Sequence, residues 1–256
     1  MPTPFTHLAI AQRMLGDAAI PAAHRDLLIA HRGAFYLGQV AADGHELSAA
    51  KREDTHFYNY TTPITEHPWR VMMDRNPSLW DRHDEPFRAF LAGYIAHLGV
   101  DEHWLTAMLA PFFAERPDWA DRYERFLMLH IILIHMDERD HAAVTSAHLF
   151  PAGDTAHQLG AAAPANWLPF MTDHGLREWG AVVYRQIKPD GRSETLDILA
   201  PRVKKTPADL RYILDTPNEI NRRLWAFVPR EYWMQTEREM YAFARDQMIA
   251  YLDGAR

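Results

Sequence analysis

The segment FLAGYIAHLGVDEHW (residues 90–104) indicates both the fold of this protein and a buried chemical site. On a helix at about 100° per residue, its aromatic and aliphatic residues form one apolar arc. His97 and Asp101 fall at the edge of that arc, one turn apart, so both side chains are predicted to point inward. A buried carboxylate without a partner is costly. Asp101 must therefore meet an arginine, a set of hydrogen bonds or a metal ion.

The composition is that of a globular protein. The chain has 256 residues, of which 48% are apolar and 24% charged, enough to bury a sizeable core. It contains no cysteine, which excludes disulfides, thiolate zinc sites and a thiol nucleophile. The net charge of −7 gives no electrostatic reason to bind nucleic acid or anionic membranes, so no nucleic-acid partner is expected.

Neither a targeting segment nor a membrane span is predicted. The stretch MPTPFTHLAIAQRML (residues 1–15) lacks a basic leader followed by a long apolar core. The longest apolar run, FLMLHIILIHM (residues 126–136), is too short to cross a bilayer and contains two histidines. We therefore expect a soluble, cytoplasmic protein without stable membrane insertion. Histidine is the unusual feature, with 15 in the chain.

Helical patterns recur along the chain, whereas alternating strand patterns are almost absent. We predict helices near residues 5–16, 21–31, 34–42, 68–75, 86–109, 117–140, 141–148, 154–163, 173–187, 193–200, 206–214, 217–226 and 230–252, the fifth ending before Pro111.

These helices predict a single all-α domain over residues 1–256, a helical bundle with additional C-terminal helices. Residues 1–150 are expected to form a metal-binding core, and the helices of residues 170–256 to pack on it. The best linker candidate is GAAAPANWLP at residues 160–169, which is short and contains a tryptophan.

Four segments place a histidine or an aspartate among apolar neighbours. His7 lies in PFTHLA, Asp43 in LGQVAADG and His56 in EDTHFYN, while AHLGVDEHW contains both His97 and Asp101. Imidazole and carboxylate are ligands that suit zinc, at about 2.0–2.2 Å from the ion. The four-residue spacing in the last segment separates Cβ atoms by about 5–6 Å, so this pair can share one ion or hold two ions through the aspartate.

Each candidate also has a purely structural interpretation. His7 fits a capped or surface position on a helix, and Asp43 can simply end a helix before Gly44. His56 fits a hydrogen-bonded loop residue. His97 and Asp101 fit a buried ion pair. The order of all these residues together favours a metal site.

In this order the residues resemble the zinc-dependent phospholipase C family, which is related to the fungal zinc-dependent single-strand nucleases. The resemblance covers residues 1 to about 105 and rests on the motifs MPTPFTH, AADG, THFYN and HLGVD. It implies an all-helical bundle of the phospholipase C/nuclease type, with a cluster of zinc ions at a site that cleaves phosphodiesters. It also implies that His7 binds an ion together with the N-terminal amine, which Pro2 would supply after removal of Met1.

The remaining ligand assignments also come from the resemblance. Asp43, His56 and His97 would bind a second zinc ion, and Asp101 would bridge the two ions. Asp43 is the candidate catalytic residue, as a base or a water-orienting carboxylate at the metal centre.

The sequence departs from the family pattern after Asp101. The nearest following histidine is His103, and the next helical segment, LHIILIHMDERDH (residues 129–141), contains no histidine four residues before a Glu or Asp. The next helix instead offers His130, Asp137 and His141 on one face. The sequence therefore supports two zinc ions and leaves a third without a complete ligand set.

These observations predict a zinc-dependent hydrolase that cleaves a phosphodiester with a metal-activated water. The substrate would be a small-molecule or a phospholipid ester. Tyr58, Tyr60 and Trp104 are candidates for the wall of its cleft, although aromatic residues in apolar runs more often belong to the core.

Two other classes stay open at this stage. A His-Asp-type metal phosphohydrolase needs an adjacent His-Asp pair on a helix, and the pair His83-Asp84 reads as a loop. A non-catalytic metal-binding or helical interaction protein would use its buried histidines for packing. The aromatic segment EYWMQTEREMYAFARDQMIAYL (residues 231–252) could then present a partner surface, although its apolar positions more simply face the core.

Overall fold

The computed structural model describes residues 1–114, 116, 118–119, 121–146, 159, 165–188 and 190–255. Within these residues every regular element is a helix, so the all-α prediction is confirmed. The predicted helix near 154–163, apart from Leu159, and the first half of the proposed linker, residues 160–164, lie outside the described residues. None of the described helices combines the length and the hydropathy that a bilayer crossing requires.

The N-terminal half contains most of the short elements. They are α1 (Pro4–Leu15), α2 (Ala22–Ala30), α3 (Arg32–Ala41), the 3-10 helix η1 (Ala42–Ser48), α4 (Arg52–His56), α5 (Pro68–Arg75), the 3-10 helix η2 (Pro77–Leu79), α6 (Glu85–Trp104) and the π-helix η3 (Leu105–Ala114). The rest of the chain forms α7 (Arg122–Ser146), α9 (Asp173–Ile187), α10 (Thr195–Arg202), α11 (Pro207–Asp215), α12 (Pro217–Ile220), the π-helix η4 (Asn221–Trp225) and α13 (Arg230–Leu252).

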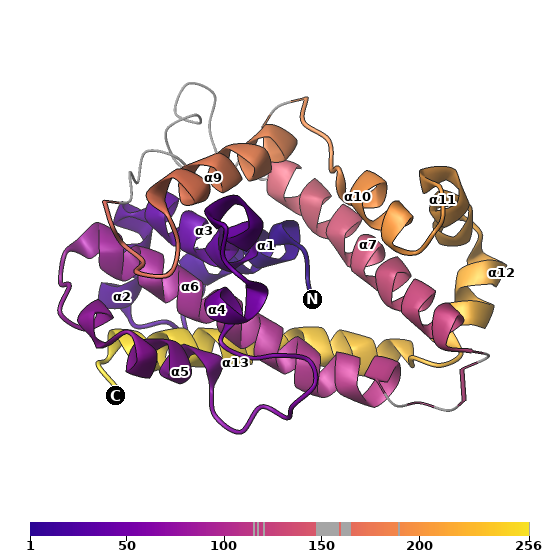
Figure 1. The fold of residues 1–256 in the computed structure, drawn as a ribbon, viewed down its shortest axis with the longest axis horizontal. Helices are drawn as coiled ribbons and strands as arrows, with labels where there is room; N and C mark the ends of the chain where they lie inside the picture. The colour runs from indigo at the N-terminus through magenta and orange to yellow at the C-terminus, as the bar shows by residue number, and fades with distance from the viewer. Residues whose placement is uncertain are drawn as a thin grey trace.

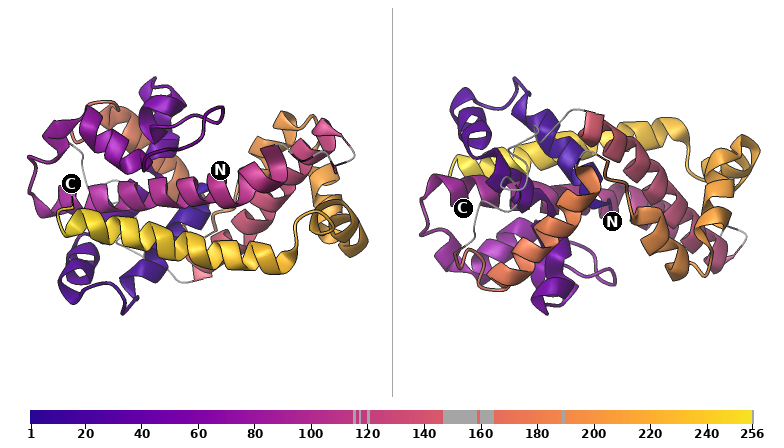
Figure 2. Two further views of the ribbon diagram at one scale, coloured as in Figure 1. Left: turned by 90° about the horizontal axis from the view of Figure 1, so that it is seen from below. Right: turned by 90° about the horizontal axis from the view of Figure 1, so that it is seen from above.

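Long helices organise the molecule around α6. Helix α3 packs closely against one side of α6, and α13 runs along another side (Figures 1 and 2). Helix α1 packs against α7, which crosses the molecule obliquely in Figure 1 and carries α10 and α11 at its side. One continuous cluster of buried apolar side chains extends from Phe5 in α1 to Leu252 in α13. The C-terminal helices are therefore packed on the N-terminal core.

Local signals explain most helix starts. Pro4 and Pro68 occupy first-turn positions, where a missing backbone N–H costs nothing. The Asp84 carboxylate caps α6 by accepting a hydrogen bond from the Phe87 backbone N–H at 3.1 Å. Thr206 begins α11 with a reciprocal capping box.

Several predicted helix boundaries are wrong, and the helix expected from about residue 117 begins only at Arg122. The helix that was expected to end before Pro111 continues through it as the π-helix η3. A wider i→i+5 turn avoids the clash between the proline ring and the carbonyl four residues earlier, which would break an α-helix. The separate helix predicted near 141–148 is the last part of α7, because the helix runs without interruption to Ser146.

The contact between α3 and α6 is a contact between backbones. A Cβ atom added at Gly93 of α6 would lie 3.0 Å from the backbone nitrogen of Gln39 and still closer to the carbonyl oxygen of Phe35. An atom added at Gly38 of α3 would clash in the same way with the carbonyl oxygen of Phe90. The two glycines therefore allow the close approach of these helices.

Candidate metal centre

The structure brings together the five residues that the sequence singles out. They come from separate elements: His7 from α1, Asp43 from η1, His56 from α4, and His97 with Asp101 from α6. Nε2 of His7 lies 3.6 Å from Oδ1 of Asp101. Nε2 of His56 lies 3.4 Å from Oδ1 of Asp43 and 3.5 Å from Oδ2 of Asp101. Nε2 of His97 lies 3.8 Å from Oδ2 of Asp101.

The two histidines on α6 and α4 are oriented by backbone carbonyls. Nδ1 of His97 lies 2.8 Å from the carbonyl oxygen of Gln39 on α3, and Nδ1 of His56 lies 3.2 Å from that of Arg52. When Nδ1 carries the proton and donates it to the carbonyl, Nε2 is left as the basic nitrogen. In both residues Nε2 is the atom that faces the aspartates.

Asp43 is positioned by the C-terminal half of the chain. The 3-10 helix η1 continues α3 directly and packs against α9. Nε1 of Trp179 on α9 donates a hydrogen bond to the carbonyl oxygen of Val40 at 2.6 Å. Gly44, next to Asp43, leaves room for the Trp179 ring, since a Cβ there would lie 2.9 Å from it. The chain therefore does not leave the helical conformation before Gly44, as the structural interpretation of Asp43 had it, but continues through it as η1.

His7 is held by the packing of α1. Its imidazole is fully buried and stacks on the His97 ring, with the ring centroids 3.9 Å apart. The neighbouring Thr6 hydroxyl donates a hydrogen bond to Oδ2 of Asp140 on α7 at 2.7 Å, which ties α1 to α7. The Asp140 side chain is itself buried, so this hydrogen bond is part of the packing between the two helices.

The buried polar atoms at this centre fit a divalent metal. Several ligand atoms are buried and have no hydrogen-bond partner among the residues that the structure describes. They are both ring nitrogens of His7, Nε2 of His56 and of His97, Oδ1 of Asp101 and Oδ2 of Asp43. Buried donors and acceptors are normally paired, because an unpaired one is costly. Two ligands at about 2.1 Å from a tetrahedral ion lie roughly 3.4 Å apart. The observed separations of 3.4–3.8 Å match that geometry.

The ligand atoms fall into two groups of three. One group holds His7, His97 and Asp101, and the other holds Asp43, His56 and His97, with the atoms of each group within 4.8 Å of one another. Nε2 of His97 has one lone pair and can bind only one ion. Asp101 instead has one oxygen toward His7 and the other toward His56 and His97. Its carboxylate is the group that can serve both sets of ligands.

Protonation states at the centre also suit a metal. Burial, followed by the nearby His7, lowers the pKa of His97 to about 3, so its imidazole is neutral at pH 7. Burial by itself would raise the pKa of Asp43, but the neighbouring His97 and His56 outweigh it and hold the value at about 2. For Asp101, His7 and His97 likewise outweigh burial and keep its pKa well below the ordinary value. Neutral imidazoles and ionised carboxylates are the forms that bind zinc.

The chain start lies close to the same centre. Burial lowers the pKa of the Met1 amino group, and the charges of Asp101, Arg52 and Asp43 all act on it. Figure 1 shows the N-terminus among the helices near α1 and α4. The same amino group contributes to lowering the pKa of His130, after the larger effect of burial. The predicted role of a terminal amine as a ligand remains a prediction.

A basic residue that the sequence reading missed lies against Asp101. Nη2 of Arg52 lies 3.5 Å from Oδ2 of Asp101 and donates a hydrogen bond to the Tyr58 hydroxyl at 2.6 Å. The Tyr58 hydroxyl in turn donates to the same oxygen of Asp101 at 3.1 Å. The available signal was the four-residue spacing of Arg52 and His56, which places both on one face of α4.

The other residues named from the sequence lie elsewhere. The Asp137 carboxylate accepts hydrogen bonds from Ser193 and Thr195 at 2.6 and 2.9 Å. His141 contacts the carbonyl oxygen of Gln186 at 2.7 Å. Among the described residues, neither they nor His130 join the two ligand groups, so this face of α7 does not complete a third site.

The remaining candidates divide between core and surface. His103 packs against the Phe243 ring, 5.6 Å between centroids, and belongs to neither ligand group. Trp104 is fully buried, so it belongs to the core rather than to a cleft wall. Tyr60 is 49% exposed. His83 and Asp84 lie outside helices, as the loop reading predicts.

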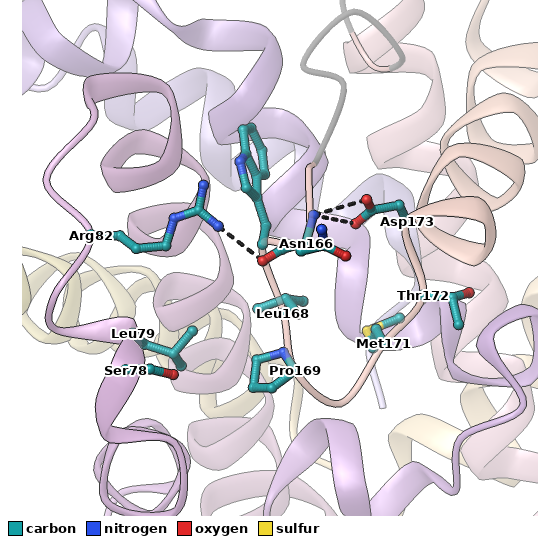
Figure 3. Close-up of a pocket in the computed structure, with 10 residues that line it drawn as sticks. Ser78, Leu79, Arg82, Asn166, Leu168, Pro169, Met171, Thr172 and Asp173 are labelled. Carbon is teal, nitrogen blue, oxygen red and sulfur yellow. Dashed lines mark hydrogen bonds between the residues drawn. The ribbon is translucent and has the colours of Figure 1, made fainter.

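A cavity of about 610 Å³ lies apart from the candidate metal centre. It is bordered by η2 and by the segment 166–173, and Figure 3 shows the side chains that line it. Nη1 of Arg82 donates to the carbonyl oxygen of Asn166 at 2.9 Å, and Asp173 accepts from the Asn166 backbone N–H at 2.8 Å. None of the five candidate ligands lines this cavity. The candidate metal centre is therefore identified by its converging polar side chains and not by this cavity.

Comparison with known proteins identifies no relative. No protein-family model matches the chain, and no curated protein or solved structure matches it either. The resemblance to the zinc-dependent phospholipase C family therefore stays an inference from the sequence motifs. The argument for function rests on the geometry of His7, Asp43, His56, His97 and Asp101.

Proposed function

We propose that this protein is a zinc-dependent hydrolase of phosphoric esters, similar to phospholipase C, that holds two zinc ions. The supporting observation is the convergence of five buried or half-buried side chains, each with a buried ligand atom that has no hydrogen-bond partner among the described residues. His7 would bind one ion, Asp43 and His56 the other, and Asp101 both. His97 would complete the ligand set of one of the two ions.

Zinc would lower the pKa of a bound water toward neutrality and neutralise charge on the phosphoryl group. Hydrolysis would form a new P–O bond from the water oxygen and break the ester P–O bond. One proton of the water would pass to the leaving oxygen, so the products would be a phosphate monoester and an alcohol. Of the five ligands, Asp43 has the most exposed side chain, at 22%, and one of its oxygens lacks a partner. Its carboxylate would act on the water as a base or as an orienting group.

The test is a metal analysis combined with an activity assay. The protein purified in the presence of zinc should contain about two equivalents and hydrolyse bis-p-nitrophenyl phosphate. A chelator should abolish the activity, and added zinc should restore it. The variant His97→Ala should lose both zinc and activity. The matched control His135→Ala, a half-buried histidine packed between Trp225 and Trp233, should retain both.

Three results would contradict the proposal. Less than one equivalent of zinc after mild purification would exclude a zinc centre. Retention of zinc by His97→Ala would show that the ligand assignment is wrong. Zinc binding without hydrolysis of any phosphoric ester would instead support a non-catalytic metal-binding protein.

A further inference from the structure

The guanidinium group of Arg52 uses only part of its hydrogen-bonding capacity. Nη2 contacts the Tyr58 hydroxyl and Oδ2 of Asp101, as described above. Nη1 is buried and has no hydrogen-bond partner within the described part of the chain. An unpaired buried donor on a permanently charged group is costly, and guanidinium donors suit carboxylate and phosphate oxygens. A buried arginine nitrogen without a partner beside a metal centre therefore points to an anionic ligand.

Two tyrosine rings hold the Arg52 guanidinium in place. Its central carbon lies 4.7 Å from the centroid of the Tyr58 ring and 4.3 Å from that of the Tyr60 ring. The two rings meet edge to face, with their centroids 6.1 Å apart. Such cation–π contacts restrict the arginine and reduce the entropy that it would lose on binding a ligand. Because Tyr60 is 49% exposed, this cluster connects the metal centre with the surface.

Charge at the occupied site also favours an anion. Two zinc ions would bring four positive charges, which Asp43 and Asp101 offset only in part. Arg52 adds a further positive charge in contact with Asp101. An anionic ligand would restore the balance, whereas a neutral carboxylic ester would not.

We propose that Arg52 is a substrate-binding residue that donates an Nη1–H hydrogen bond to a non-bridging phosphoryl oxygen, which makes this site selective for anionic phosphate esters over neutral esters. The proposal rests on the proposed function, because it assigns the substrate class of the same metal centre. Tyr58 and Tyr60 are positioning residues in this arrangement, since they orient the guanidinium without themselves contacting the phosphate.

The experiment measures the binding of inorganic phosphate to the zinc-loaded protein by titration calorimetry, with zinc content determined on each sample. Arg52→Gln should bind phosphate about 10- to 100-fold more weakly than the wild type while it retains its zinc. Arg52→Lys should bind phosphate more tightly than Arg52→Gln but less tightly than the wild type. Lysine keeps the positive charge but lacks the planar guanidinium group. The control Arg13→Gln removes another arginine stacked on a tyrosine, with its central carbon 3.7 Å from the Tyr241 ring centroid, and should bind phosphate like the wild type.

Kinetics give the second measurement. For Arg52→Gln, kcat/KM for bis-p-nitrophenyl phosphate should fall about 100-fold, whereas any hydrolysis of neutral p-nitrophenyl acetate should be unchanged. Equal phosphate affinity in the wild type and Arg52→Gln, or no phosphate binding by the wild type, would overturn the proposal. Loss of zinc from Arg52→Gln would also overturn it, because Arg52 would then serve to hold Asp101. Failure of the proposed function is distinct: the wild type would bind zinc and phosphate through Arg52 but hydrolyse no ester.

Discussion

The substitution Gly93→Ala tests whether the close approach of α3 and α6 builds the metal centre. The added methyl group would meet the backbone of α3, 3.0 Å from the nitrogen of Gln39 and closer to the carbonyl oxygen of Phe35. Nonbonded carbon contacts prefer separations of about 3.5–4.0 Å, so the helices must move apart by roughly 1 Å. Because two backbones collide, the cost lies toward the upper end of overpacking penalties, about 3 kcal/mol. The better helix propensity of alanine offsets about 1 kcal/mol of this.

The net loss of about 2 kcal/mol should lower Tm by about 4–8 °C for a chain of this size. The hydrogen bond between Nδ1 of His97 and the carbonyl oxygen of Gln39, now 2.8 Å, crosses the same interface and should lengthen. Zinc affinity should therefore fall about 10- to 100-fold, as when an outer hydrogen bond to a metal-binding histidine is removed.

Circular dichroism melts and competition with a zinc-binding dye measure both effects. The control is Gly16→Ala, where a Cβ would meet only the carbonyl oxygen of Arg13 at 3.8 Å, so neither value should change. A Gly93→Ala protein with the Tm and zinc affinity of the wild type would refute the backbone contact and its role in orienting His97.

Further predictions concern the metal, pH and a remote helix cap. Removal of zinc should lower Tm by about 5–10 °C, since a ligand at 100 times its Kd stabilises by about 2.7 kcal/mol; an unchanged melt after chelation would count against metal binding. In zinc-free protein, burial lowers the pKa of His97 to about 3, whereas an unfolded histidine titrates near 6.5. The unfolded chain then gains a proton that the folded chain does not, so stability should fall by about 1.4 kcal/mol per pH unit as pH decreases from about 6.5 toward 3. Urea unfolding at pH 7 and pH 5 should show this loss of stability, and the loss should be smaller in His97→Gln. An equal change of stability with pH in the wild type and His97→Gln would contradict the prediction. Thr206→Ala breaks the capping box of α11 and should cost about 1 kcal/mol in urea unfolding without any loss of zinc; loss of zinc would show that α11 is coupled to the metal centre.

Helix positions were largely predictable because their signals are local. The predicted bounds 68–75, 173–187 and 230–252 agree with α5, α9 and α13. Proline at a first turn, a capping side chain and a 3.6-residue apolar period act over only a few neighbours. The error at Pro111 arose because the local rule considers an α-helix, whereas the chain there forms the wider π-helix.

Sequence by itself determined the all-α class and indicated that His97 and Asp101 are buried among apolar residues, since both follow from residue type and periodicity. Only the tertiary structure decided that α1, η1, α4 and α6 meet, because that depends on the packing of helices distant in sequence. It also decided the contact of Arg52 with Asp101 and the orientation of His97 by Gln39. Such contacts join residues about 50 or more positions apart, and no local spacing encodes the distance between two helix backbones.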